Sequence, residues 1–280
     1  MRALPKPADD AQAVFLLCIS RVTSVALKGR LISISGDIHA AADIFDACSA
    51  AGTAYTLVPE DGVAGVVTTK EMVAVYDQRM ARDGAPGRSI YERLLAAPPM
   101  ETCPLCGQRT VSTLDHHLPK TKFPALAVTP TNLVPACKDC NKAKDARIAG
   151  TADEQTLHPY YDDIDGDRWL RAQVVHSSPA ALRFSVDPPI AWSAVLTNRV
   201  RHHFHVFALA DLYASHSGVE LTNIRHSLQE IFAAAAGPGV VAHLHGQAVS
   251  RQAAQRNSWQ TAMYDALYQD HWFCSGGFDL

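Results

Sequence analysis

The segment CPLCGQRTVSTLDHHLPKTKFPALAVTPTNLVPACKDCNKAK, residues 103–144, contains two cysteine pairs, each with the spacing Cys-x-x-Cys. Tetrahedral zinc binds four thiolates at about 2.3 Å, and one tight turn can supply two ligands with this spacing. The segment therefore predicts one structural zinc ion. Its expected ligands are Cys103, Cys106, Cys137 and Cys140.

The 30 residues between Cys106 and Cys137 exceed the usual gap of a zinc ribbon, so they are long enough to form a hairpin. This insert carries the sequence LDHHLPK, residues 114–120, and Asn141 directly follows the second cysteine pair. Residues with acid–base and metal-binding side chains thus lie inside and beside the predicted zinc site.

These residue types suit the hydrolysis of a phosphodiester. Histidine, with a pKa near 6.5, is the natural base at neutral pH, which predicts that His116 activates a water molecule. Carboxylate and amide oxygens are hard ligands, so Asp115 and Asn141 are the candidate ligands of Mg²⁺. Neighbouring side chains of an extended segment point to opposite faces, which would place base and metal on opposite sides of a phosphate.

The sequences CPLCG, LDHHLPK and TNLVPACKDCNKAK together resemble the HNH, or ββα-metal, nuclease family, in the subgroup held by a four-cysteine zinc. In that family an acidic residue precedes a histidine, and a proline follows the histidine after three places, as in Asp115, His116 and Pro119. The middle asparagine of the family falls on Asn132 and the last on Asn141. The similarity covers about residues 101–147.

The resemblance implies a catalytic set of Asp115, His116, Asn132 and Asn141, with Asn132 holding the loop or the His116 ring. It also implies cleavage of DNA with Mg²⁺ or Mn²⁺, leaving 5′-phosphate and 3′-hydroxyl ends. The whole chain, including LHPYYDDID and the terminal CSGGF, is similar to a group of bacterial HNH proteins. Some HNH proteins act in antiphage defence pairs beside an ATPase, so we expect a regulatory protein partner such as an ATPase, or a homo-oligomer.

Several of these residues also have a structural interpretation. Asp115 could be an ordinary acid at a strand end, and Asn141 could cap the helix that it begins. His117 fits packing as well as binding, and His158, which follows the motif, fits either a buried structural role or contact with metal or phosphate. A non-catalytic zinc module that binds nucleic acid or a protein partner is the alternative function.

Positive charge is concentrated around the motif. Residues 101–150 contain seven lysines and arginines against four acids, a net charge of +3, whereas the whole chain has a net charge of −3. The lysines could form an ordinary solvated face, but their position predicts contacts with the phosphates of DNA. The expected contact residues are Lys120, Lys122, Lys138, Lys142, Lys144 and Arg147.

The remaining sequence predicts a mainly helical protein, and together with the ββα-metal zinc module that the resemblance implies the expected fold class is α+β. Its three expected parts are a helical region (1–98), the nuclease module (99–168) and a hairpin with helices (169–280). Within them we expect helices over 9–34, 37–51 (opened by Asp37), 68–82 and 89–97, a hairpin over 171–187, and long helices from Ile190 onward.

Composition indicates an ordinary globular protein, with 48% hydrophobic and 19% charged residues. The longest strongly apolar stretch covers only residues 13–19, which predicts neither a signal peptide nor a membrane span. Three further cysteines, Cys18, Cys48 and Cys274, occur singly. Free thiols together with metal-bound thiolates predict a reducing, cytoplasmic location.

Overall fold

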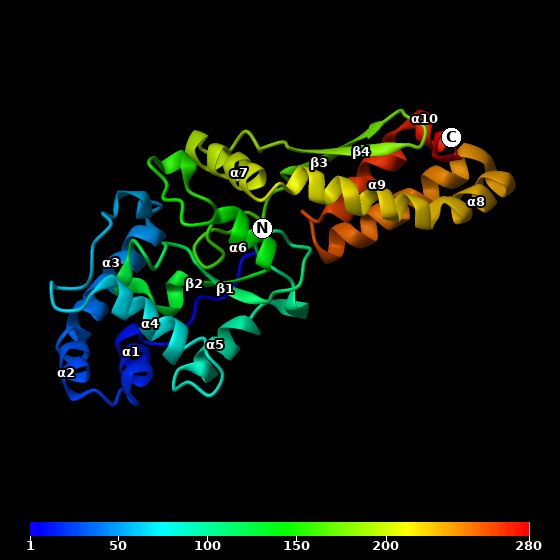
Figure 1. Cartoon of the computed structure of the whole chain (residues 1–280). Helices are drawn as coiled ribbons and strands as arrows, with labels where there is room; N and C mark the ends of the chain where they lie inside the picture. Colours follow the sequence, from blue (N-terminus) through cyan, green and yellow to red (C-terminus); the bar gives the residue numbers. More distant parts are fainter. Residues whose placement is uncertain (280) are drawn as a thin grey trace. The chain divides into compact units, whose positions relative to one another are not determined.

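The protein is mainly helical and contains two small antiparallel sheets, as the sequence predicts. The computed structural model describes residues 1–279, and the chain divides into two compact units, Met1–Asp163 and Ile164–Leu280. Figure 1 shows the elements of both units. The candidate site lies in the first unit.

The first unit contains six α-helices and one two-stranded sheet among the described residues. Its elements are α1 (Ala11–Ile19), α2 (Val25–Ser33), α3 (Ser35–Ala50), α4 (Thr69–Arg79), α5 (Arg88–Leu95), β1 (Thr113–His116), β2 (Leu133–Ala136) and α6 (Lys138–Lys144). The helix predicted to begin near residue 68 is confirmed: Thr68 and Glu71 form a reciprocal capping box at the start of α4.

Two helix boundaries differ from the prediction. The single helix expected over 9–34 is two helices, because Ser24 adopts an extended backbone and its side chain caps α2. Asp37 does not cap α3. That helix begins at Ser35, and Asp37 lies in its first turn, where a negative charge is favoured by the positive end of the helix dipole.

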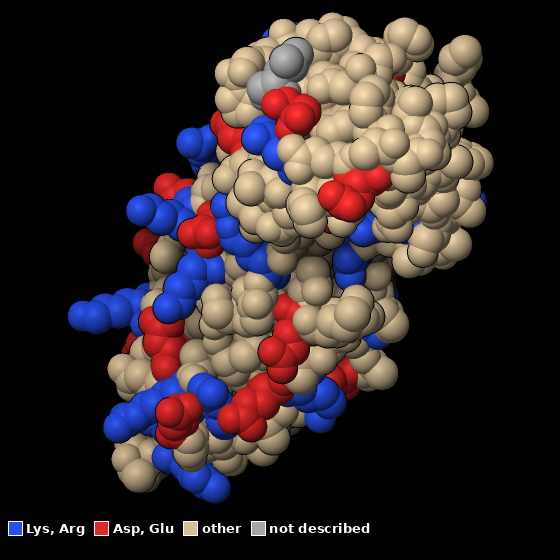
Figure 2. All heavy atoms as spheres, turned by 90° about the vertical axis from the view of Figure 1, so that its right-hand side faces the viewer, with Lys and Arg blue, Asp and Glu red and all other residues tan. Residues whose placement is uncertain are grey.

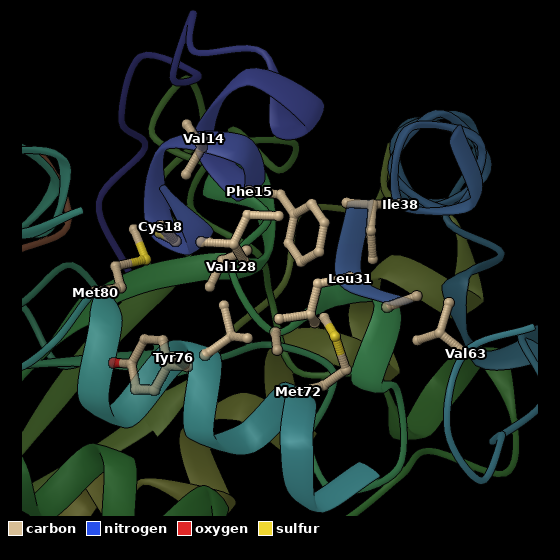
Figure 3. Packing of buried hydrophobic residues seen from close by; sticks show 14 of the residues in the cluster. Val14, Phe15, Cys18, Leu31, Ile38, Val63, Met72, Tyr76, Met80 and Val128 are labelled. Carbon is tan, nitrogen blue, oxygen red and sulfur yellow. The ribbon is translucent and has the colours of Figure 1, made fainter. Parts of the chain in front are cut away.

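The N-terminal helices and the predicted nuclease module share one hydrophobic core. Phe15, Ile38 and Met72 from the helices belong to the same buried cluster as Leu114 and Leu133 from the sheet. Figure 3 shows Tyr76 beside Met72 and Met80 on α4, with its ring in this cluster. The N-terminal helices therefore support the strand that carries Asp115 and His116.

The second unit consists of the predicted hairpin and four helices within the described residues. They are β3 (Leu170–Val175), β4 (Ala181–Val186), α7 (Ala194–Val206), α8 (Leu209–Ala254), α9 (Trp259–Gln269) and α10 (His271–Cys274). In Figure 1, α8 and α9 run side by side next to the hairpin. The long helix α8 is kinked at Ala236, where φ is +51°, just before Pro238, which lacks an amide hydrogen.

The surface of the second unit carries few charged side chains on the face that Figure 2 shows. Tyr264 and Phe273 are buried in this unit. Among the described residues, no helix combines the length and apolar character needed to cross a membrane.

Candidate active site and zinc cluster

The elements β1, β2 and α6 form a continuous hairpin-and-helix unit. The strands are antiparallel, with Asp115 opposite Val134 and His116 opposite Leu133. One residue after β2, Cys137 starts α6, which packs against β1. Helix α6 therefore lies against the strand that carries Asp115 and His116.

The four paired cysteines meet at one point. The sulfur atoms of Cys103, Cys106, Cys137 and Cys140 all lie within 4.8 Å of one another, and all four residues are buried. Four thiolates around zinc at about 2.3 Å would be separated by about 3.8 Å, so a small contraction accommodates the ion. The donor set and its spacing therefore fit the predicted structural zinc.

Backbone amides turn toward two of these sulfur atoms. The Arg109 amide donates to Cys106 Sγ and the Cys140 amide donates to Cys137 Sγ, each over 3.4 Å. Such hydrogen bonds stabilise negative charge on a thiolate. The Cys137 sulfur also caps the N-terminus of α6, so this residue belongs both to the four-cysteine cluster and to the start of the helix.

Asn141 does not cap a helix, and the expectation that it begins one was wrong. Helix α6 begins at Lys138, three residues earlier, because the Cys137 sulfur accepts the first-turn hydrogen bond. Asn141 lies within the helix, and its amide nitrogen donates to Thr113 Oγ1 over 3.3 Å. This contact directs the amide nitrogen of Asn141 toward β1. The amide oxygen, Oδ1, takes no part in this contact.

Asp115 is buried and forms an ion pair. Its carboxylate lies 3.1 Å from the Lys144 ammonium, and both side chains are 7% exposed. Burial raises the pKa of Asp115, and the attraction of Lys144 opposes this rise. Asp115 is thus a buried, paired acid near the end of β1.

His116 is buried with a defined tautomer. Its Nε2 atom lies 2.8 Å from the carbonyl oxygen of Ala127, which can only accept, so Nε2 carries the hydrogen and Nδ1 is the basic atom. Burial, assisted by the charge of Lys120, lowers the pKa of His116 to about 3. The imidazole is consequently uncharged at neutral pH, the form that accepts a proton.

Asn132 holds the loop that follows His116. It is fully buried, its Oδ1 accepts from the Leu118 amide over 2.8 Å, and its Nδ2 donates to the carbonyls of Leu118 and Leu126 over 3.0 and 3.2 Å. The side chain thereby joins the two ends of the loop between β1 and β2. The alternative prediction was that Asn132 holds the His116 ring. Its side chain instead bonds to the backbone of Leu118 and Leu126.

His117 and His158 contact each other. Their ring centroids are 4.3 Å apart, and His158 is buried among Phe45, Tyr160 and Tyr161. His158 Nδ1 accepts a hydrogen bond from the Tyr160 amide over 3.2 Å. These contacts favour the structural interpretation of both histidines.

A pocket of about 520 Å³ brings together three of the four predicted catalytic residues, whereas Asn132 does not line it. Asp115, His116 and Asn141 line it with Tyr76, and further lining residues are Thr113, Leu114, Pro119, Lys120, Thr121, Lys142, Asp145 and Ala146. The Tyr76 ring meets the His116 ring edge-on, with centroids 4.4 Å apart. Tyr76, which comes from α4, was not found from the sequence, because no motif links it to a strand 38 residues away.

The basic residues around the motif differ in their surroundings. Lys122, Lys138, Lys142 and Arg147 are exposed, in keeping with the expected phosphate-contacting surface. The Lys120 ammonium lies 3.0 Å from Asp77 and 4.3 Å from the centre of the Tyr76 ring. Lys144, by contrast, is buried against Asp115, so its charge is not part of an open surface.

Comparison with known proteins finds a match to one protein family in the same segment. Residues 103–147 match the model of the HNH endonucleases. Over its full length the chain is also similar to the protein ea31 of Escherichia phage lambda, with 25% identity across 99% of this chain and 100% of ea31. No solved structure shows significant similarity.

The HNH segment carries donors that fit a small divalent cation. Asp115 provides a carboxylate and Asn141 an amide oxygen at one pocket, and the remaining positions could be filled by water and substrate phosphate, the arrangement typical of Mg²⁺. The match supports a nuclease-type function in general, and it includes all four cysteines of the zinc cluster.

Proposed function

We propose that the protein is a metal-dependent HNH endonuclease that hydrolyses phosphodiester bonds of DNA. The observation that carries this proposal is the pocket that Asp115, His116 and Asn141 line together within the HNH segment. It combines a neutral histidine with two hard oxygen donors. These are the groups that phosphodiester hydrolysis at neutral pH requires.

In the proposed reaction, His116 accepts a proton from the attacking water at Nδ1. The hydrogen bond from Nε2 to the Ala127 carbonyl fixes the ring and stabilises the positive charge that then forms. Asp115 and Asn141 would hold the cation, which supplies positive charge to the scissile phosphate and the leaving oxygen. Attack by water breaks the bond to the 3′-oxygen and leaves a 5′-phosphate and a 3′-hydroxyl.

Exposed lysines and an arginine beside the pocket supply a surface for the phosphates of DNA. Lys142 lines the pocket itself. Lys122, Lys138 and Arg147 are exposed and lie close in sequence to residues that line the pocket. Such contacts release counterions, so binding should weaken steeply as the salt concentration rises. This surface favours nucleic acid over an uncharged substrate.

The function is tested by incubating the zinc-loaded protein with plasmid DNA, single-stranded DNA and RNA in Mg²⁺, in Mn²⁺ and in EDTA. We expect cleavage of DNA that requires Mg²⁺ or Mn²⁺ and stops in EDTA. Binding of nucleic acid with no cleavage in any metal would instead support the alternative, a non-catalytic zinc module.

Asn141 allows a sharper test of the proposed ligand set. Because Asn141 does not cap α6, Asn141→Ser should fold normally, yet its short side chain should lose most cleavage. Asn141→Asp keeps an oxygen at the same distance and should retain more activity than Asn141→Ser. Cleavage measured against Mn²⁺ concentration checks this order. Equal activity and equal Mn²⁺ dependence in wild type and Asn141→Ser would exclude Asn141 as a ligand.

We further propose that the nuclease acts in the bacterial cytoplasm as the effector of an antiphage system. A loosely specific nuclease endangers its own host, which favours restraint by a partner such as an ATPase or by self-association. The full-length similarity to ea31 shows only that a related protein is encoded by a phage, so the defence role rests on the analogy with other HNH proteins. Copurification of the tagged protein with the products of neighbouring genes tests this regulation.

A further inference from the structure

Lys144 is a buried cation in direct contact with Asp115 at the candidate site. Its ammonium group lies 3.1 Å and 3.4 Å from the two carboxylate oxygens of Asp115, and it donates to the carbonyl oxygen of His116 over 2.7 Å. All of these acceptors belong to β1, whereas Lys144 is the last residue of α6. One lysine thus neutralises the acid that the proposed function assigns to the metal.

We propose that Lys144 is a built-in counter-ion of Asp115, and that a divalent cation binds Asp115 only in competition with this lysine. The inference rests on the proposed function in one respect, which is that Asp115 is a ligand of the cation. It adds that the ion pair with Lys144 must open before the cation binds Asp115, and that this opening is coupled to the last turn of α6.

The competition follows from charge and space. Two cations a few ångströms apart at one buried carboxylate repel each other strongly, because the protein interior screens their charges less than water does. A divalent ion roughly doubles this repulsion. Asp115 therefore cannot bind Lys144 and a divalent cation equally tightly at the same time.

The end of α6 provides a place for the required movement. The helix ends at Lys144, and Asp145 continues with φ of +54°, so the backbone leaves the helix directly after the lysine. Asp145 and Ala146 are exposed and line the same pocket. Displacement of Lys144 would move its ammonium from Asp115 toward this pocket, where the Asp145 carboxylate and a substrate phosphate are the available anions.

The pair also stabilises the metal-free protein. A buried carboxylate without a partner is strongly unfavourable, so removal of the Lys144 charge should destabilise the protein in the absence of divalent cations. The same substitution removes the repulsion that opposes the cation. The substitution should thus lower stability without divalent cations and raise the affinity for them. A purely structural role of Lys144 predicts only the loss of stability.

The test is the affinity of the zinc-loaded protein for Mn²⁺, measured by titration calorimetry at pH 8. Lys144→Met retains most of the length of the side chain without its charge, and we expect it to bind Mn²⁺ at least about tenfold more tightly than wild type. The control is Lys142→Met, which removes an exposed lysine from the same helix and the same pocket. We expect it to change the affinity less than about threefold.

Thermal unfolding supplies the second measurement. Without divalent cations Lys144→Met should unfold at a lower temperature than wild type, and Mn²⁺ should raise its Tm by more. Lys144→Gln, which keeps a donor for the His116 carbonyl, should show the same two shifts if Lys144→Met does not fold. Equal or weaker Mn²⁺ binding in both variants would overturn the proposal.

These results are independent of catalysis. A wild type that cleaves DNA but matches the Lys144 variants in Mn²⁺ affinity would overturn this inference and leave the proposed function intact. Tighter Mn²⁺ binding by the variants, with no cleavage of DNA or RNA by wild type, would support the inference and contradict the proposed function.

Discussion

Replacement of Cys137 by serine is expected to abolish zinc binding and to unfold the region around the site. The sulfur of Cys137 contributes both to the four-cysteine cluster and to the cap of α6. Structural zinc contributes on the order of 10 kcal/mol in small domains, as much as the whole stability of many proteins. Metal analysis and hydrogen exchange of the β1 and β2 amides provide the measurements.

Cys48→Ser is the matched control for this zinc prediction. Cys48 is a partly exposed free thiol in α3, so its replacement should leave zinc content and unfolding unchanged. A Cys137→Ser protein that remains soluble and unfolds cooperatively without zinc would show that the four cysteines do not hold a structural ion.

Replacement of His116 by alanine is expected to reduce the cleavage rate by about 10²-fold or more, the usual contribution of a positioned general base. DNA binding should persist, because His116 is buried and the exposed lysines remain in place. The measurement is the single-turnover cleavage rate together with DNA affinity by fluorescence anisotropy.

His117→Ala separates the two adjacent histidines. His117 packs against His158 with its ring tilted by 43°, so its replacement should affect stability more than cleavage. An inactive His117→Ala protein beside an active His116→Ala protein would place the base one residue further along the chain.

The turn formed by each cysteine pair could be predicted because it depends on a short-range pattern, and the ββα order followed from the resemblance to the HNH family. Two residues between paired cysteines set the turn geometry, and alternation along a strand separates neighbouring side chains such as Asp115 and His116. The cap at Thr68 is equally local, since its partner Glu71 lies one helical turn away. In each case the physical constraint acts within a few residues.

The contacts of the site could not be predicted because they join distant parts of the chain. Lys144 resembles the exposed lysines around it in sequence, and only the packing of α6 on β1 brings it to Asp115, 29 residues away. Tyr76 reaches His116 from a helix outside the HNH segment. The start of α6 was misplaced because cysteine is an uncommon cap, which here accepts a hydrogen bond through sulfur.

The central claim is that the Asp115 pocket hydrolyses phosphodiesters with a divalent cation. It is tested most directly by the rate of plasmid cleavage in Mn²⁺ by wild type and Asp115→Asn, at equal zinc content and equal folded fraction. We predict cleavage by wild type that stops in EDTA, and a loss of about 10²-fold or more in Asp115→Asn. Equal rates in the two proteins would contradict the account.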